Sequence, residues 1–203
     1  MYEAAVRQDE QLTKADPANR VYKMELAKYC DNLSYVLAQL GESDLAQARS
    51  QEALDLLEAL AFPAPSLAIE QADAHNVRAT LLQSKDRAGA LGEYREAFEL
   101  FARSWRDTTT RYSAPAHERY QDFLVNLARF ARDSDDAGVH TLLMRAVIAY
   151  LEFAQASLAS GSAADARVVV DNVSNLLPEL TPRDRPEIVT RHRALQDRLS
   201  AYK

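Results

Sequence analysis

The stretch that decides the fold runs from Tyr22 to Leu60 and reads YKMELAKYCDNLSYVLAQLGESDLAQARSQEALDLLEAL. On both sides of Gly41, apolar residues recur every three or four positions, which is typical of amphipathic helices. Glycine adopts the left-handed backbone conformation that ends many helices without steric cost. The stretch therefore predicts a helical hairpin, with one helix from Tyr22 to Leu40 and the next from Leu45 to Leu60.

The rest of the chain continues this pattern. Helices end where Pro or Gly interrupts, and those residues cluster between long stretches free of both. Strand signals are scarce, because the valines at 168–170 lie among Ala and charged residues and no Asn-Gly or Asp-Gly turn occurs. Further helices are expected near residues 3–14, 66–84, 87–106, 115–132, 136–160, 163–177 and 184–202. The sequence thus predicts an all-α fold of about nine helices.

The composition excludes several classes of protein. The 203 residues are 47% hydrophobic, enough for one sizeable core, and the single cysteine excludes an internal disulfide. No run of about 20 apolar residues predicts a membrane span, and the start lacks the pattern of a signal peptide. The net charge of -6 disfavours general binding to nucleic acid or anionic lipid. We expect a soluble cytoplasmic protein that binds neither nucleic acid nor membrane.

The chain repeats itself at an interval of 44 residues. A shift of 44 residues aligns residues of the same type: Ala46 with Ala90, Ala53 with Ala97, Leu37 with Leu81 and Asn32 with Asn76. The spacing of one Gly and two small residues also returns near the C-terminus: Gly41, Ala46 and Ala53 match Gly161, Ala166 and Val173. A fixed interval of this kind predicts stacked helical hairpins rather than a closed bundle.

These residues resemble the tetratricopeptide repeat, in which a first-helix Leu, a turn Gly and two small residues recur in each unit. A junction similar to that of bacterial arrays of this family is formed by Leu12, Ala15, Asp16, Pro17 and Asn19. The resemblance implies a right-handed solenoid of helical hairpins with a concave inner surface. The chain departs from the family pattern in three ways. Its interval is 44 rather than 34 residues. Arg78 stands where the family has a small residue, and Lys85 stands where the family has the turn Gly.

We expect a single domain of this kind over residues 1–203. Its expected parts are a half repeat at 1–17, a repeat at 18–62, a degenerate repeat at 66–106, an irregular helical pair at 115–149, a repeat at 150–178 and a capping helix at 184–203. The pair at 115–149 lacks the spacing of Gly and Ala, so its stacking register stays open. The half repeat lacks a partner helix, which suggests a piece cut from a longer protein.

The sequence contains no motif that predicts catalysis. Glycine-rich phosphate loops, zinc-protease motifs, serine-hydrolase motifs and calcium loops are all missing. The four histidines are scattered, and Cys30 lies on an apolar stripe, where a buried hydrophobic role is expected. The acidic turn at 133–136 is expected to stabilise a helix N-terminus rather than to bind calcium. We expect no enzyme activity, no cofactor and no metal.

The C-terminal segment from Arg183 to Lys203 carries a local charge of +3. Its buried stripe would consist of Ile188, Leu195, Leu199 and Tyr202. A charged outer face suits the terminal capping helix of a solenoid, and this interpretation is favoured. The alternative is that the segment attracts an acidic partner or nucleic acid.

The candidate site is the inner groove, because the resemblance implies that the first helices of the repeats line it. On the helix from Tyr22 to Leu40, polar residues recur at helical spacing: Lys28, Asn32, Tyr35 and Gln39. The shift of 44 residues adds three residues of the next repeat: His75, Asn76 and Gln83. Asn and Gln can pair with a peptide backbone, and Tyr35 offers contact area. Alternatively, Asn32 and Asn76 only tie adjacent repeats together.

These observations predict a non-catalytic scaffold that binds a protein or peptide segment in its groove. The basic clamp by which some family members hold a terminal carboxylate is not reproduced beyond Lys28, so the partner need not end in an acidic tail. The alternative function is that of a regulatory or sensor module in a larger bacterial signalling protein, such as a Ser/Thr kinase, with the signalling domain fused upstream. The junction between Leu12 and Asn19 suggests this alternative, because it resembles arrays that follow bacterial kinase domains.

Overall fold

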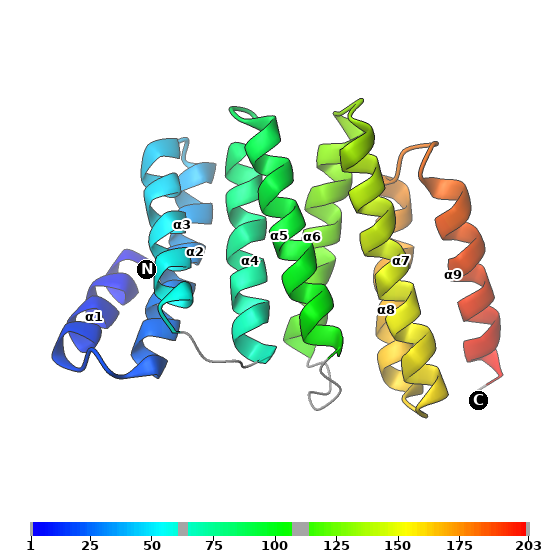
Figure 1. The fold of residues 1–203 in the computed structure, drawn as a ribbon, viewed down its shortest axis with the longest axis horizontal. Coiled ribbons are helices and arrows are strands. Elements are labelled where there is room, and N and C mark those ends of the chain that lie inside the picture. Colours follow the sequence, from blue (N-terminus) through cyan, green and yellow to red (C-terminus); the bar gives the residue numbers. More distant parts are fainter. Residues whose placement is uncertain (1, 61–64, 107–113, 202–203) are drawn as a thin grey trace. The chain divides into compact units, whose positions relative to one another are not determined.

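The computed structural model describes residues 2–60, 65–106 and 114–201. Over these ranges the chain forms nine α-helices and one 3-10 helix and contains no strand (Figure 1). The helices are α1 (Tyr2–Ala15), α2 (Arg20–Gln39), α3 (Ser43–Glu58), α4 (Pro65–Leu82), α5 (Arg87–Arg106), α6 (Ala114–Arg132), α7 (Ala137–Ala159), α8 (Ala163–Leu176), η1 (Leu177–Glu179) and α9 (Arg185–Ser200). The predicted all-α class of about nine helices is confirmed.

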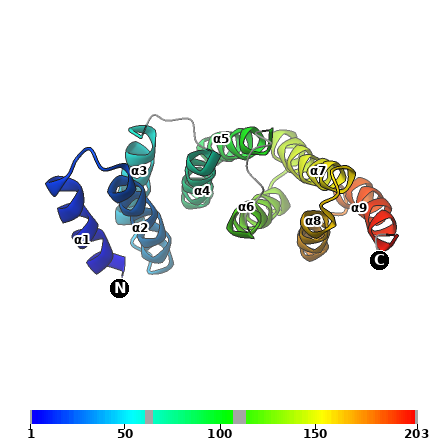
Figure 2. The same cartoon turned by 90° about the horizontal axis from the view of Figure 1, so that it is seen from below.

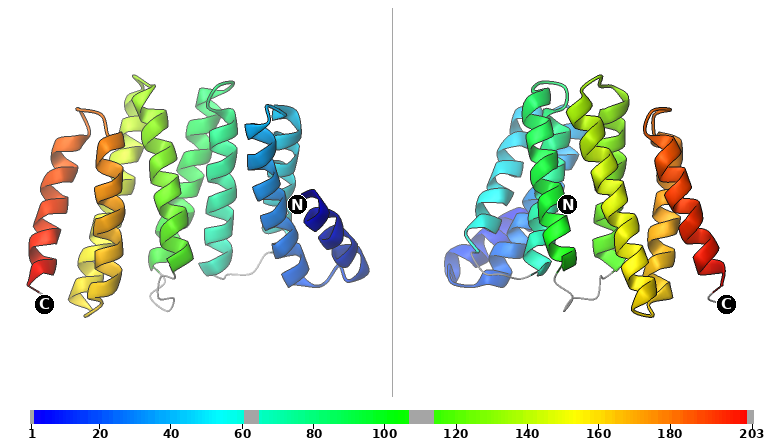
Figure 3. Two further views of the ribbon diagram at one scale, coloured as in Figure 1. Left: turned by 180° about the vertical axis from the view of Figure 1, so that it is seen from behind. Right: turned by 45° about the vertical axis from the view of Figure 1, so that its right-hand side comes forward.

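The chain divides into two compact units, Met1–Ser104 and Trp105–Lys203. In the first unit α2 packs against α1, α3 and α4, and it lies beside α3 in Figure 2. In the second unit α7 packs against α6, α8 and α9 (Figure 3). The sequence predicts one domain over residues 1–203. Because the structure forms two compact units, each unit is described by itself.

The two predicted glycine turns close their hairpins in the same way. Gly41 has a φ of 80° and Gly161 a φ of 89°, both in the left-handed region that favours glycine. The residue after each glycine donates its backbone N–H to a carbonyl oxygen in the last turn of the helix, from Glu42 to Leu37 at 2.9 Å and from Ser162 to Ser157 at 2.8 Å. This bond satisfies a carbonyl that the helix end would otherwise leave unpaired. The prediction that a glycine ends these helices is confirmed.

The small residues of the repeat pattern lie in the cores of the units. The exposed fraction is 0% for all six: Ala46, Ala53, Ala90, Ala97, Ala166 and Val173. A small side chain at such a position lets two helices approach closely. Their burial agrees with the packing role that the 44-residue interval predicts.

Helix α7 runs without a break from Ala137 to Ala159, in agreement with the helix expected near residues 136–160. Its start is fixed by Asp136, whose carboxylate accepts the backbone N–H of Gly138 at 2.7 Å, as expected for the acidic turn.

Helix α7 is also the described helix that is long and apolar enough to cross a membrane, with a mean hydropathy of 1.3. Half of that stretch is buried inside the unit. A buried core helix meets the same criterion of length and composition, and α7 has helices packed against it on several sides.

Helix α9 has one buried face and one charged face. Its buried residues follow helical spacing: Ile188, His192, Leu195 and Leu199. Arg193 and Arg198 lie on its exposed side. This arrangement is what the favoured interpretation as a capping helix requires, whereas Tyr202, predicted for the buried stripe, lies outside the described residues.

Candidate peptide-binding surface

Three of the predicted site residues form an exposed ridge on α2. Asn32, Tyr35 and Gln39 are all exposed, and Tyr35 keeps 54% of its surface in solvent. The opposite side of the same helix carries Cys30 and Leu37, which pack in the core of the unit. Because a helix places residues three and four positions apart on one face, the sequence itself produces this ridge. We call Asn32, Tyr35 and Gln39 the α2 ridge.

Lys28 lies at the end of the α2 ridge, where α2 meets α4. Its ammonium group is 3.0 Å from the Glu25 carboxylate on α2 and 3.7 Å from the Glu70 carboxylate on α4. The second contact ties α2 to α4 at this point, through a residue that is not part of the row predicted on α4. Both contacts also neutralise the charge of Lys28, so its ammonium is already shared between two carboxylates of the same unit.

The row predicted on α4 has a different environment. His75 Nδ1 is 2.7 Å from Glu93 Oε2 on α5, and the Gln83 side-chain amide donates to the hydroxyl of Tyr94. Burial raises the pKa of Tyr94 to about 12, so this hydroxyl stays protonated at neutral pH. His75 and Gln83 therefore hold α4 against α5.

Asn76 lies inside the unit, with 2% of its surface exposed. Ala72 and Ala79, one turn to either side on α4, are both 0% exposed. The shift of 44 residues thus pairs an exposed Asn32 with a buried Asn76. The two alanines were the signal in the sequence, because a stripe of small residues around Asn76 favours close helix packing over solvent exposure. This position fits the alternative that Asn76 ties neighbouring helices together.

Arg78, which stands where the repeat pattern expects a small residue, joins three helices. Its Nε is 3.1 Å from Glu93 Oε1 on α5, and its guanidinium also donates to the Gln51 side chain on α3. Glu93 thus accepts from both His75 and Arg78. The departure from the pattern has a structural role that the sequence did not reveal.

A pocket that the sequence analysis missed lies between α1 and α2. It encloses about 260 Å³, and its walls include Asp9 on α1 and Tyr22, Glu25 and Tyr29 on α2. The buried Oδ2 of Asp9 has no hydrogen-bond partner among the described residues. Burial of this carboxylate, and next the nearby Glu25, raise the pKa of Asp9. Spacing of three and four residues on both helices was the only sign of this pocket in the sequence.

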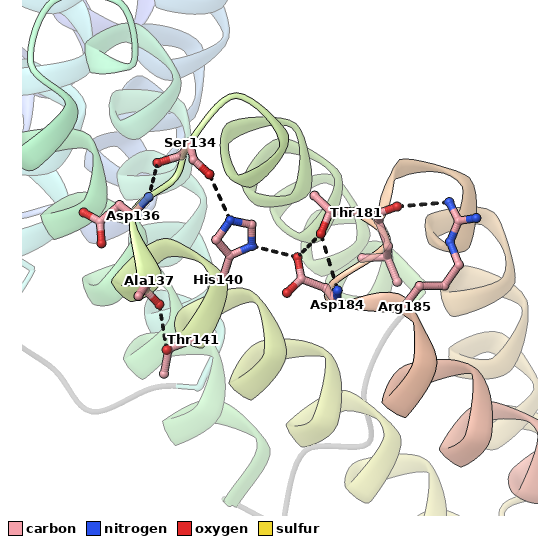
Figure 4. A network of polar contacts seen from close by, with 9 residues as sticks. Ser134, Asp136, Ala137, His140, Thr141, Thr181, Asp184 and Arg185 are labelled. Atoms are coloured by element: carbon pink, nitrogen blue, oxygen red, sulfur yellow. Dashed lines mark hydrogen bonds and ion pairs between the residues drawn. The ribbon is translucent and has the colours of Figure 1, made fainter.

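In the second unit, a buried network surrounds His140 (Figure 4). Its Nδ1 is 2.8 Å from Asp184 Oδ2, and its Nε2 is 2.9 Å from the backbone oxygen of Ser134. Thr181 also donates its hydroxyl to Asp184 Oδ2, at 2.7 Å. Both ring nitrogens thus lie within hydrogen-bond distance of oxygen atoms, one of a side chain and one of the backbone. Because the hydroxyl contacts the carboxylate rather than the imidazole, the group lacks the order of a nucleophile, base and acid triad.

A second buried polar group joins α6, α7 and α8. His117 Nδ1 is 2.8 Å from the Tyr150 hydroxyl, which also accepts from the Asn172 amide at 3.0 Å. The Trp105 ring stacks on the Tyr150 ring with centroids 5.5 Å apart. Burial lowers the pKa of His117, so its neutral form is favoured at neutral pH. This cluster belongs to the core of the second unit.

The described residues contain no group of three or more His, Cys, Asp or Glu side chains that could hold a metal ion. Cys30 is 0% exposed, and burial raises its thiol pKa to about 12, so the reactive thiolate is suppressed. The expectation that Cys30 is a core residue is confirmed.

Comparison with known proteins adds no family. The chain matches no family model and no curated protein. Among solved structures it is similar to the crystal structure of BtubC (BKLC) from P. vanneervenii, with 12% identity and a TM-score of 0.42, over 98% of this chain and 87% of that one. A likeness of this degree supports no conclusion on function.

Proposed function

We propose that this chain is a non-catalytic, tetratricopeptide-like module that binds a segment of another protein along the α2 ridge. The observation that carries the proposal is the exposure of Tyr35 between Asn32 and Gln39 on one helix face. An exposed tyrosine offers a large contact area at low entropic cost, and the amides beside it can bond to a peptide backbone. Among the described residues, none hydrogen-bonds to the side chains of Asn32 or Gln39.

The helical hairpins support the tetratricopeptide-like part of the proposal. The matching turns at Gly41 and Gly161 and the buried small residues after them are the features for which the family pattern has a physical reason. Such modules act as rigid platforms, since each hairpin contacts only its neighbours. A rigid ridge loses little conformational freedom when a partner binds.

The test is selection of peptides from a random displayed library on the full chain, followed by titration of the selected peptides. We expect Tyr35→Ala to weaken binding at least about tenfold, since buried aromatic anchors at interfaces contribute 2 kcal/mol or more. Tyr2→Ala is the matched control, because Tyr2 on α1 is another exposed tyrosine, with 37% of its surface in solvent. Equal affinity of wild type and Tyr35→Ala, with an unchanged helix signal in circular dichroism, would reject the α2 ridge as the binding surface.

The second candidate function is that of a regulatory module in a larger bacterial signalling protein such as a Ser/Thr kinase. The junction that suggests it is ordered: the Asn19 side chain accepts the backbone N–H groups of Val21 and Tyr22 at 3.0 and 3.3 Å. Asn19 thereby caps α2 and fixes how the chain leaves α1. Reading the natural gene upstream of Met1 tests this candidate, because it requires a kinase or similar domain in the same reading frame.

A further inference from the structure

The pocket between α1 and α2 combines aromatic, apolar and acidic walls. Tyr22 and Tyr29 come from α2, one on each side of Glu25, and Leu12 and Val21 add apolar surface. Val21 is 60% exposed, so the apolar wall reaches the surface. The volume of about 260 Å³ lies just below that of pockets that hold whole drug-sized ligands, and it suits a single long side chain.

One carboxylate of this pocket, that of Asp9, has no cation paired with it among the contacts of the described residues. Asp9 has an oxygen that is both buried and without a hydrogen-bond partner, which is costly for a carboxylate. The Glu25 carboxylate pairs with the Lys28 ammonium at 3.0 Å, and the same ammonium also contacts Glu70. Among the contacts of the described residues, Lys28 has none with Asp9. The surrounding unit, residues 1–104, contains 17 acidic and 11 basic side chains, so its wider field also attracts cations.

The lining of the pocket favours an organic cation over a metal ion. No group of three metal-ligating side chains occurs in the part of the chain that the structure describes. Two tyrosine rings beside the carboxylates are suited to an ammonium or guanidinium group, because the face of an aromatic ring attracts cations. The apolar wall is suited to the methylene groups of a Lys or Arg side chain.

We propose that this pocket binds a Lys or Arg side chain of the partner protein. Glu25 connects the pocket to the α2 ridge through its ion pair with Lys28, so a segment on the ridge would place a basic residue at the pocket. The inference deepens the proposed function, on which it rests for the source of the side chain. It assigns Asp9 as the carboxylate that pairs with the incoming charge.

The test is a titration of the isotopically labelled full chain with the peptide acetyl-Ala-Lys-Ala-amide, followed by backbone amide shifts in NMR. We expect saturable shifts that are centred on Asp9, Tyr22 and Tyr29. The same peptide with an acetylated lysine, which keeps the length and removes the charge, is expected not to bind. Asp9→Asn should weaken binding at least about fivefold, because hydrogen bonds to a charged group contribute strongly when partly buried.

The control variant is Glu3→Gln, which removes the same charge from the same helix at an exposed position outside the pocket. It should leave the affinity for the lysine peptide within a factor of two. A Tyr29→Leu variant, which keeps the apolar wall and removes the ring, should weaken binding without removing a charge.

Three results would overturn the pocket: no saturable shift, equal binding of the acetylated peptide, or equal weakening by Asp9→Asn and Glu3→Gln. Equal weakening by both variants would show that the net negative charge of the first unit, rather than the pocket, attracts the lysine peptide. If library-selected peptides still depend on Tyr35 while the lysine peptide fails to bind, the proposed function stands and this inference falls. If the lysine peptide binds at Asp9 and no peptide depends on Tyr35, the reverse holds.

Discussion

Replacing His140 with leucine should destabilise the second unit strongly. The imidazole is 9% exposed and the Asp184 carboxylate 3%, and the two are 2.8 Å apart. Leucine fills the space of the ring but leaves Asp184 with the Thr181 hydroxyl as its remaining side-chain contact. The backbone oxygen of Ser134 also loses its donor. The variant therefore leaves a buried carboxylate without its imidazole partner.

The expected cost follows from the burial of this pair. Removing a hydrogen bond to a buried charged group costs about 1.5–3 kcal/mol, because the carboxylate is left without that partner. For a chain of this length, that loss lowers the melting temperature by about 3 to 12 °C. His75→Leu is the matched control, because the contact between His75 and Glu93 is more exposed: 18% and 19% of these side chains are accessible to solvent. This contact should contribute about 1 kcal/mol or less to the free energy of unfolding.

The assay is urea unfolding, followed by tryptophan fluorescence for the second unit and by far-ultraviolet circular dichroism for variants in the first unit. Trp105 is the single tryptophan and belongs to the second unit, where its ring stacks on Tyr150, so its emission reports on the unit that contains His140. A double-mutant cycle with Asp184→Leu should give a coupling free energy above about 1 kcal/mol. A single-variant cost below that value, or additive effects within about 0.5 kcal/mol, would refute the reasoning from burial.

Four further changes test other features of the structure. Ala53→Leu should overpack the contact between helices and cost about 1–3 kcal/mol in the free energy of unfolding, while an unchanged urea midpoint would contradict close packing there. Gly41→Ala forces a side chain into a backbone with a φ of 80° and should lower stability by about 1 kcal/mol, measured by the same unfolding curve. Cys30 should resist iodoacetamide at pH 8 in the folded chain and react on addition of urea, because burial raises its thiol pKa to about 12; fast labelling without urea would contradict this. Because the folded pKa of Asp9 is raised, its ionisation costs stability as the pH rises from its ordinary value of 3.8 through the folded value, so Asp9→Asn should raise the melting temperature at pH 7 and have no effect below both pKa values.

Local features of the fold could be predicted from the sequence because short segments determine them. The ends of α2 and α7 follow from Gly41 and Gly161, whose positive φ is a property of the residue type. The burial of Ala46 and Ala53 follows from their spacing after the turn. In each case a few neighbouring residues carry the information.

The candidate site could be predicted only in part, because exposure depends on which helices pack together. The α2 ridge follows from helical spacing, but the corresponding face of α4 is covered, and Asn76 is buried although it matches Asn32 in the shifted alignment. A shift compares residue types and does not include the neighbouring helices. The alanines beside Asn76 held the missing information.

Contacts between residues that are far apart in the chain could not be predicted from the sequence. His140 and Asp184 are 44 positions apart, and no motif connects them. The same is true of Asp9 and Glu25, which face one pocket from two helices. These pairings depend on how the helices are placed, and they supply both the polar network of the second unit and the acidic pocket of the first.

The position of Arg78 has a consequence for how this chain can change by mutation. A rigid, planar guanidinium reaches Glu93 on one side and Gln51 on the other, and neither lysine nor a small residue can do both. Substitution by the small consensus residue of the repeat would therefore remove the side-chain contacts that connect α4 to α3 and α5. Among the described residues, the Glu93 carboxylate would then keep only its contact with His75. Consensus design, a common route to more stable repeat proteins, should fail at this one position.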